Sequence, residues 1–406
     1  MDAARTSKEN AHIPELDGIR GVAIALVVMF HFFYTAAAPT PGGLAWHAIA
    51  PLRIGWTGVD LFFVLSGFLI GGILLDARES SNYFRTFYTR CFYRILPLYA
   101  AIVLVSFLLR LTLKQGYSTH FSWMLVGRFP WFSYVFFMQN FWMAATNTWG
   151  TWGLGCTWSL AIEEQFYMTL PLLIWLFKPK QLQKFLVAAV IAAPVLRTLL
   201  CIGWPKDFLL TFTLMPCRAD ALLLGVLGAI AMRTPVYRAW IEQHNRLILG
   251  AIFALLIGCG VLIHIASSQD SLLMRTFGYS WMALLYSLIL VYSLTQKSSF
   301  ISRVLRVQPL RSLGKIAYGV YLLHGWVLVG LAALISPSHP FRDSFPVLDS
   351  WYQFGITMLA LLLTIVLCQL SWRYFEKPLV QIGHRAKYRF DLASDVPEAP
   401  QLVGSR

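Results

Sequence analysis

The chain has 406 residues, of which 57% are hydrophobic and 13% are charged, and its mean hydropathy is +0.61. These values exclude a soluble globular protein and a disordered chain. The net charge of +14 is explained first by membrane orientation, since lysine and arginine gather on the cytoplasmic side. We therefore expect a lipid bilayer, and no nucleic acid, as a partner.

Ten apolar runs are each long enough to cross a bilayer, which requires about 20 residues in a helix. A further aromatic stretch, Trp131 to Trp142, is short and rich in residues that favour the headgroup level, so we expect it at the interface. The first run is followed by no cleavage site of the Ala-x-Ala kind and should remain as an anchor. The ten runs lie near residues 19–38, 56–75, 95–112, 157–177, 185–203, 213–232, 247–266, 278–295, 316–336 and 352–372.

The basic residues set the orientation of these spans. With ten crossings, 24 of the 33 lysines and arginines fall on one side, which the positive-inside rule assigns to the cytoplasm together with both termini. The predicted fold class is therefore all-α, a polytopic membrane helix bundle of about ten transmembrane helices. We expect residues 1–12 to be a cytoplasmic segment, 13–380 one membrane domain, and 381–406 a disordered cytoplasmic tail. The six scattered cysteines indicate neither a metal site nor a disulfide framework.

The first span carries an arginine at its start and a histidine inside it. The eleven steps from Arg20 to His31 rise about 16 Å along a helix and bring the two side chains within ~20° of one face. Arg20 then lies at the membrane surface and His31 near the midplane. An imidazole in hydrocarbon is costly to desolvate and usually lines a cavity or pathway, although a hydrogen bond to a neighbouring helix explains its position as well.

The second span and the connector after it carry further polar residues. A carboxylate at the outer end of a span, here Asp60, needs a partner or a wet cavity. Ser66 and Gly67 are better explained by close helix packing than by chemistry. Arg90 and Arg94 are four residues apart, so they share a helix face, and guanidinium groups suit phosphate. A topology-setting charge or contact with anionic lipid explains the two arginines equally well.

Two adjacent acids begin the span near 157–177. Glu163 and Glu164, followed by Tyr167, should be buried or paired with a cation, and we favour a functional site over a structural ion pair, for instance to Arg218. Arg218 and Asp220 at the outer end of another span are expected to pair with each other.

A second histidine lies inside the span near 316–336. His324 is about nine residues, or ~14 Å, into that span, and Tyr321 lies one helical turn before it on the same side. A core histidine bonded to a backbone carbonyl explains His324 as well as a catalytic role does.

These stretches together resemble the acyltransferase 3 family of bacterial integral-membrane O-acyltransferases over residues 13–380. One departure matters, because the family usually has two adjacent arginines where this chain has Arg90 and Cys91. The family's fused esterase-like domain is expected to be missing, since nothing of domain size follows the last predicted span. The six motifs that carry the resemblance are Leu16 to Arg20 with His31, Gly58 to Phe68, Arg94 to Tyr99, Thr157 to Tyr167, Tyr318 to His324, and Glu376 to Pro378.

The resemblance implies an acyltransferase in the bacterial cytoplasmic membrane. It would move an acyl group, acetyl above all, from acyl-CoA to a hydroxyl of a carbohydrate or glycolipid of the cell envelope, without a bound cofactor or metal. His31 would act as general base or be acylated itself, while Glu163, Glu164 or Asp60 orients the imidazole or the acceptor. Arg20, Arg90 and Arg94 would bind the donor phosphates. Further candidate site residues are Ser66, Tyr167, Tyr321 and His324.

Three alternatives stay open at this point. The acceptor could be a macrolide or another small molecule. A proton-coupled transporter would also place histidine and glutamate at midplane, but it predicts paired hydropathy repeats, and none is evident. A non-catalytic scaffold would leave the intramembrane polar residues unexplained.

Overall fold

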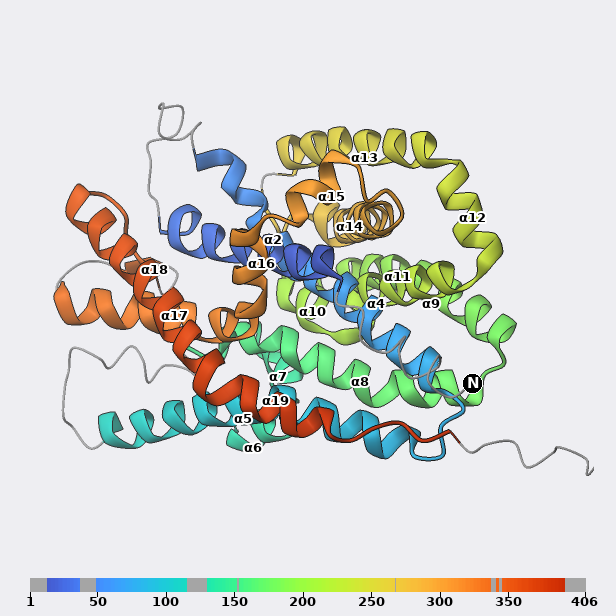
Figure 1. The fold of residues 1–406 in the computed structure, drawn as a ribbon. Coiled ribbons are helices and arrows are strands. Elements are labelled where there is room, and N and C mark those ends of the chain that lie inside the picture. The colour runs from blue at the N-terminus through green and yellow to red at the C-terminus, as the bar shows by residue number, and fades with distance from the viewer. Residues whose placement is uncertain are drawn as a thin grey trace, which may run out of the picture.

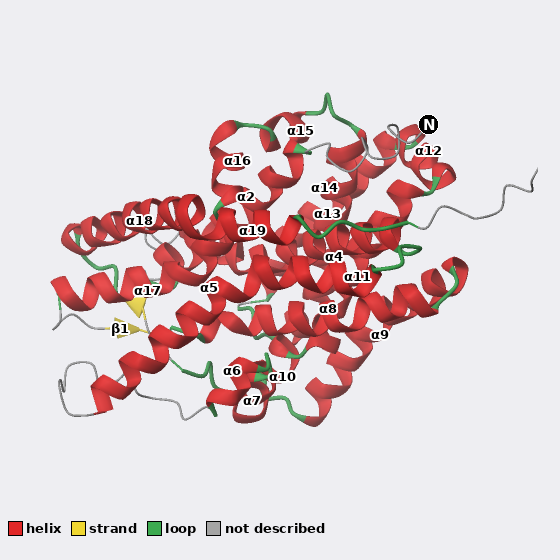
Figure 2. Cartoon of the chain, turned by 60° about the horizontal axis from the view of Figure 1, so that its bottom comes forward, coloured by secondary structure: helices red, strands yellow, loops and turns green. Residues whose placement is uncertain are grey.

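The computed structural model describes residues 13–36, 49–114, 130–151, 153–266, 268–336, 341–342 and 345–390. This part of the chain is a bundle of helices with one small antiparallel ribbon, β1 (Phe341–Arg342) and β2 (Phe345–Pro346) (Figure 2). The predicted N-terminal segment 1–12 and the last part of the predicted tail, 391–406, lie outside the described residues.

The long helices are in several cases extended by a turn of π- or 3₁₀-helix. They are α2 (Pro14–Met29) with η2 (Phe30–Tyr34), η3 (Ala50–Thr57) with α4 (Gly58–Ala77), α5 (Tyr83–Lys114), α8 (Trp158–Leu176), α9 (Pro179–Gly203), α11 (Met215–Arg233), α13 (Asn245–Ile265), η6 (Met274–Gly278) with α14 (Tyr279–Thr295), α17 (Ala317–Ile335), and α18 (Trp351–Ser371) with η7 (Trp372–Glu376) and α19 (Lys377–His384). The short helices are α6 (Trp131–Val135), α7 (Gln139–Thr146), η5 (Gly155–Thr157), α10 (Phe208–Thr213), α12 (Pro235–Gln243), α15 (Phe300–Leu305) and α16 (Gln308–Lys315).

The predicted membrane bundle is confirmed. Within the described residues, nine helical stretches are long and apolar enough to span a bilayer, and they match nine of the ten predicted runs. The tenth run corresponds to α8, which has 19 residues but is made more polar by the sequence Glu163-Glu164-Gln165. The cytoplasmic location of the two termini stays a prediction.

The aromatic stretch does not cross the membrane as one helix. It forms α6 and α7, which have 5 and 8 residues, and neither is long enough to span. Trp131 and Phe136 are exposed, whereas Tyr134 and Asn140 are buried against the bundle. The prediction that this stretch adds no eleventh crossing is therefore confirmed.

The helix ends that we predict to be cytoplasmic contact one another. Arg78 at the end of α4 donates to the carbonyl of Phe177 after α8, at 2.8 Å. The chain also stays ordered beyond residue 381, where the tail was predicted to begin. Ser81 and Arg389 are joined through backbone atoms at 2.9 Å, and α19 continues to His384. The segment up to Phe390 is thus bound to the α4–α5 connection.

Helices α4 and α11 lie against each other at the centre of the bundle, and two glycines set how close they come (Figure 1). A Cβ atom added to Gly67 of α4 would overlap the backbone carbonyl of Leu222 on α11. In return, a Cβ atom on Gly225 of α11 would overlap the carbonyl of Val64. Small residues at such contacts let membrane helices approach closely, as the sequence analysis expected for Gly67.

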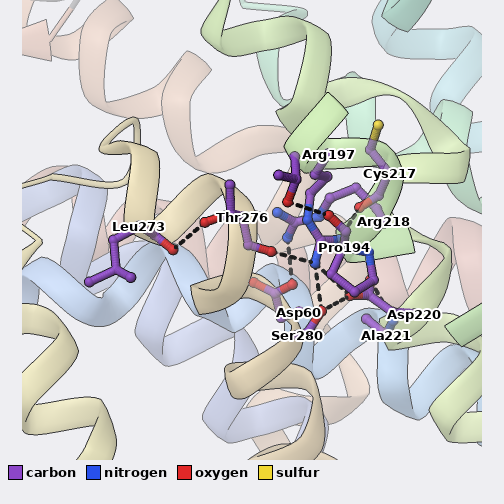
Figure 3. A network of polar contacts seen from close by, with 11 residues as sticks. Asp60, Pro194, Arg197, Cys217, Arg218, Asp220, Ala221, Leu273, Thr276 and Ser280 are labelled. Carbon is purple, nitrogen blue, oxygen red and sulfur yellow. Dashed lines mark hydrogen bonds and ion pairs between the residues drawn. The ribbon is translucent and has the colours of Figure 1, made fainter. Parts of the chain in front are cut away.

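A cluster of four buried charges joins the same central helices (Figure 3). Asp60 of α4 accepts from Arg218 of α11 at 2.5 Å, and Arg197 of α9 pairs with Asp220 of α11 at 3.0 Å. Ser280 of α14 donates to Asp220 at 2.5 Å and accepts from Arg197 at 2.5 Å. All four charged side chains are at most 1% exposed. We call Asp60, Arg197, Arg218 and Asp220 the charge cluster.

The charge cluster corrects one prediction. Arg218 and Asp220 do not pair with each other but with residues of two other helices, because side chains two positions apart on a helix point in different directions. Arg218 also lies under an aromatic ring, since its guanidinium carbon is 4.2 Å from the ring centre of Tyr279. The ion pairs and this cation–π contact offset part of the loss of water around the charge, while Nε and Nη1 of Arg218 are buried without a hydrogen-bond partner among the described residues.

We expect Gly67→Ala to destabilise the protein, because overpacking costs about 1–3 kcal/mol and exceeds the gain in helix propensity. The matched control is Gly250→Ala on α13, where an added Cβ meets nothing within 4 Å. Thermal unfolding followed by intrinsic fluorescence in detergent measures the difference. Equal unfolding temperatures for the two variants would contradict the close contact between α4 and α11.

We expect Arg218→Leu to lower the stability by about 3–5 kcal/mol, because it leaves the charge of Asp60 buried without its partner. The double variant Asp60→Leu/Arg218→Leu removes both charges and should recover a large part of that loss. The fraction of monodisperse protein after heating provides the measurement. If the loss of stability in the double variant equals the sum of the losses in Asp60→Leu and Arg218→Leu, the two residues are not coupled.

Candidate active site

A cavity of about 660 Å³ lies where α2, α4, α5, α8, α16 and α17 meet α19. Its lining on α4 runs from Val59 to Ile70, which corresponds to about 16 Å along a helix. The cavity therefore follows a large part of the depth of the bundle, and its two ends differ in chemistry.

One end of the cavity is basic. Arg20 of α2, Arg94 of α5, Lys315 of α16 and Lys377 of α19 all line it, although they come from four separate parts of the chain. Arg20 forms an ion pair with Asp17 at 2.9 Å. The other three cations form no ion pair with any described residue, so their charge is available to a ligand. We call Arg20, Arg94, Lys315 and Lys377 the basic end.

Sequence analysis named Arg20 and Arg94 but missed the two lysines of the basic end. The available signal was their position, since Lys315 and Lys377 both stand at predicted cytoplasmic ends of spans. Arg90, which was named, does not line the cavity. Its Nε donates to the carbonyl of Ala386 at 2.9 Å, and its guanidinium lies 4.9 Å from the ring centre of Tyr388.

The middle of the cavity wall carries hydroxyl groups and a carboxylate. The hydroxyls of Ser66 on α4 and Tyr167 on α8 are 2.6 Å apart. Glu163 shares a hydrogen bond with Ser66 and interacts electrostatically with Arg94. Ser66, Tyr167 and Glu163 all line the cavity, so these three predicted site residues are brought together.

Two other predicted acids lie elsewhere. Glu164 does not line the cavity, and its Oε1 is buried without a hydrogen-bond partner among the described residues. Glu164 interacts electrostatically with Glu163 and Arg94, and its charge also acts on Cys91, the position at which the sequence departs from the family pattern. Asp60 belongs to the charge cluster and is paired with Arg218. Catalytic roles for both acids stay predictions.

The end of the cavity opposite the basic end is closed by hydroxyl and aromatic groups. Tyr321 of α17 and Ser159 of α8 line it, and their hydroxyls are 2.6 Å apart. The hydroxyl of Tyr321 also donates to the carbonyl of Cys156 at 3.0 Å. Phe62 contacts the Tyr321 ring edge-on, with 6.1 Å between the ring centres.

The two intramembrane histidines meet just beyond this closed end. Nδ1 of His31 is 3.1 Å from Nε2 of His324, and the two rings are 5.0 Å apart. His31 lies in the π-helical turn η2, and Thr35 donates to its carbonyl at 2.8 Å. Such turns inside α-helices are frequent at functional sites. Neither histidine lines the cavity, but Tyr321 does, and its carbonyl is 2.8 Å from Nδ1 of His324.

The partner of His31 is not one of the predicted acids. Glu163, Glu164 or Asp60 was predicted to orient its imidazole or the acceptor, and among the described residues none of them bonds to the imidazole. The partner is another histidine, contributed by α17. The ring of Phe345, from β2, stacks on His31 at 5.2 Å with an angle of 22°. The His31 side chain is thus held between α17 and the small ribbon.

Within the described residues, no three His, Cys, Asp or Glu side chains are grouped as metal ligands. The six cysteines are free and lie buried or half-buried.

Comparisons with known proteins place the chain in one family. The family model described as "Acyltransferase domain" matches residues 13–372. The chain is 26% identical to the peptidoglycan O-acetyltransferase OatA of Listeria monocytogenes, over 93% of its own length and 57% of that protein. It is 29% identical to the putative peptidoglycan O-acetyltransferase YrhL of Bacillus subtilis, over 94% of its own length and 57% of that protein. The chain thus spans little more than half the length of these curated relatives. No solved structure matches it.

Proposed function

The chain belongs to the acyltransferase family, and from this premise we propose that it is a membrane O-acyltransferase of the cell envelope. In this proposal it moves an acetyl group from acetyl-CoA to a hydroxyl of a carbohydrate or glycolipid. The observation that carries the proposal is a cavity that follows a large part of the depth of the bundle, with a basic end and, at its opposite end, Tyr321, which contacts the His31–His324 pair.

The basic end fits the phosphates of a CoA thioester. Guanidinium groups bind phosphate with two parallel hydrogen bonds, and lysines add charge to such a site. Arg94, Lys315 and Lys377 have no ion pair among the described residues, so a phosphate would not have to displace a protein carboxylate. By the predicted orientation this end faces the cytoplasm, which is where CoA thioesters are made available.

The middle of the cavity fits the thin arm of the donor. That arm contains two amide groups, and a buried amide costs free energy unless it finds a hydrogen-bond partner. The hydroxyls of Ser66, Tyr167 and Ser159 are spread along the wall and supply such partners. The arm, when extended, covers the ~16 Å that separate the levels of Arg20 and His31 on α2.

In the proposed reaction, His31 acts next to the thioester. His31 takes the proton of the acceptor hydroxyl while its oxygen attacks the carbonyl carbon of the thioester. The C–O bond forms, the C–S bond breaks, and the thiolate of CoA leaves and takes up a proton. General base catalysis of this kind contributes about 10²–10⁴-fold to the rate.

The relatives support one class of acceptor. Their names describe peptidoglycan O-acetyltransferases, which supports a polymer or glycolipid of the envelope over a macrolide or a transported solute as the acceptor of this chain. Because the chain spans 57% of the length of these proteins, its own acceptor has to be measured.

Neutralising the basic end should weaken donor binding. We expect Arg94→Gln, Lys315→Gln and Lys377→Gln each to lower the affinity for acetyl-CoA by about tenfold, which corresponds to about 1.4 kcal/mol, and the loss should shrink at high salt. Lys184→Gln on α9, a lysine outside the cavity lining, is the matched control. Calorimetric titration of the protein in detergent measures the affinities. Variants that bind like the control would show that the donor phosphates lie elsewhere.

Removal of the proposed base should lower transfer strongly. We expect His31→Ala to reduce the acetyl content of envelope glycans and glycolipids by about 10²-fold or more, the contribution of a general base. Mass spectrometry of extracted envelope material from cells with equal membrane levels of each protein provides the measurement. The control is His264→Ala, an exposed histidine on α13. An acyl increment that survives His31→Ala would remove His31 from the mechanism, and no increment with the wild type would remove this acceptor class.

A further inference from the structure

We propose that His324 is a positioning residue that holds His31 in the tautomer with a proton on Nδ1 and a free lone pair on Nε2. The catalytic consequence of this tautomer rests on the proposed function, because the tautomer matters for catalysis only if His31 accepts a proton. The structural part stands independently, on the hydrogen bonds that surround the two rings.

The chain of bonds starts at the backbone of α17. Nδ1 of His324 is 3.0 Å from the carbonyl oxygen of Val320 and 2.8 Å from that of Tyr321. A carbonyl oxygen can only accept a hydrogen bond, so Nδ1 of His324 carries a proton. His324 is 2% exposed and no described carboxylate bonds to it, so a second proton, and with it a positive charge, would be costly. Nε2 of His324 is therefore an acceptor.

The next bond transfers this constraint to His31. Nε2 of His324 is 3.1 Å from Nδ1 of His31. Because Nε2 of His324 is the acceptor, Nδ1 of His31 has to be the donor and carries the proton. A neutral imidazole has one N–H group, so Nε2 of His31 is left with a lone pair. The bond made by one ring nitrogen thus decides the state of the other.

A second contact of His31 agrees with this assignment. The ring also bonds the carbonyl of Val27, four residues before it on the same helix. In this structure the two other histidines that bond the carbonyl four residues before them, His324 and His244, both do so through Nδ1. By analogy with these two histidines, we assign the Val27 contact to Nδ1 of His31, so that this carbonyl shares the same proton. With both contacts assigned to Nδ1, the lone pair on Nε2 of His31 remains free.

Aromatic rings pack against both histidines. Phe345 stacks on His31, and Phe32 lies nearly parallel to His324 with 6.4 Å between the ring centres. Tyr321, which lines the cavity, lies 6.2 Å from the His324 ring. A flip of His324 would place a carbon where Nδ1 now bonds two carbonyls, so the observed orientation is the one that keeps all of these bonds.

This arrangement gives His324 a task that a packing residue would not have. Free neutral histidine favours a proton on Nε2, and in that form Nε2 cannot accept a proton from a hydroxyl group. By accepting from Nδ1 of His31, His324 selects the less common tautomer, which is the one a general base needs. Loss of this acceptor should lower the rate of acyl transfer about tenfold or more. This is a part of the total rate enhancement that a general base contributes.

The direct test is ¹⁵N NMR of the full chain labelled at histidine, purified in detergent at neutral pH. Resonances are assigned by comparison with His31→Gln and His324→Gln. We expect Nε2 of His31 and Nε2 of His324 both in the region of unprotonated ring nitrogens. A protonated Nε2 on His31 would overturn the proposal, whether or not an acyl transfer has been detected.

Two substitutions separate positioning from packing. His324→Gln offers an oxygen near the place of Nε2, so it should keep His31 in the same tautomer and retain most of the acyl transfer. His324→Leu fills a similar volume without an acceptor, so it should move the Nε2 signal of His31 toward the protonated region and lower transfer at least tenfold. His264→Leu, an exposed histidine on α13, is the matched control, and size-exclusion chromatography confirms that each variant is folded.

The outcomes of this test differ from those that concern the proposed function. If His324→Leu is folded and transfers like the wild type, His324 has no positioning role while the acyltransferase proposal stands. If the wild type transfers no acyl group, the acyltransferase proposal fails, and the Nε2 signals of the wild type and of His324→Leu still decide the tautomer. Equal loss in the Gln and Leu variants would also overturn the proposal, because it would show that only the shape of the imidazole matters.

Discussion

The cost of leaving a charge without a partner in hydrocarbon governs the arrangement of this bundle. Asp60, Arg197, Arg218 and Asp220 are almost fully buried, and each is paired with a charge from another helix. These pairs join α4, α9 and α11 in one register, because no side chain could move along its helix without losing its partner. The glycine contacts between α4 and α11 require that same register, so packing and charge pairing support one another.

The fixed core formed in this way provides the walls of the cavity. Helix α4 presents Asp60 to the charge cluster and, on its other side, Ser66 to the cavity beside α8. Two groups of charged residues in the bundle thus contrast with each other. Those of the charge cluster neutralise one another and are closed to ligands, whereas the cations of the basic end are left largely without protein partners. That difference, more than burial alone, is the reason for proposing the basic end, and not the charge cluster, as a binding site.

Sequence analysis placed His31 correctly inside a span but left its neighbour open. An acid that orients the imidazole or the acceptor and a hydrogen bond to a neighbouring helix were both considered, and the hydrogen-bond partner among the described residues is His324. The spacing along each helix predicts which residues share a face, but it contains no information on which faces of distant helices meet. For the same reason Arg90 and Arg94, four residues apart, have different surroundings, since the segment up to Tyr388 covers the first of them.

The sequence by itself determined the class of the protein, its spans, the intramembrane positions of His31 and His324, and the family motifs, because these depend on hydropathy and on spacing along single helices. Only the tertiary structure decided that Asp60 is locked to Arg218, that Lys315 and Lys377 join Arg20 and Arg94 at one end of a cavity, and that the two histidines bond each other. The physical reason is that a polar group in a membrane takes its partner from whichever helix is adjacent, and adjacency is set by the packing of the whole bundle.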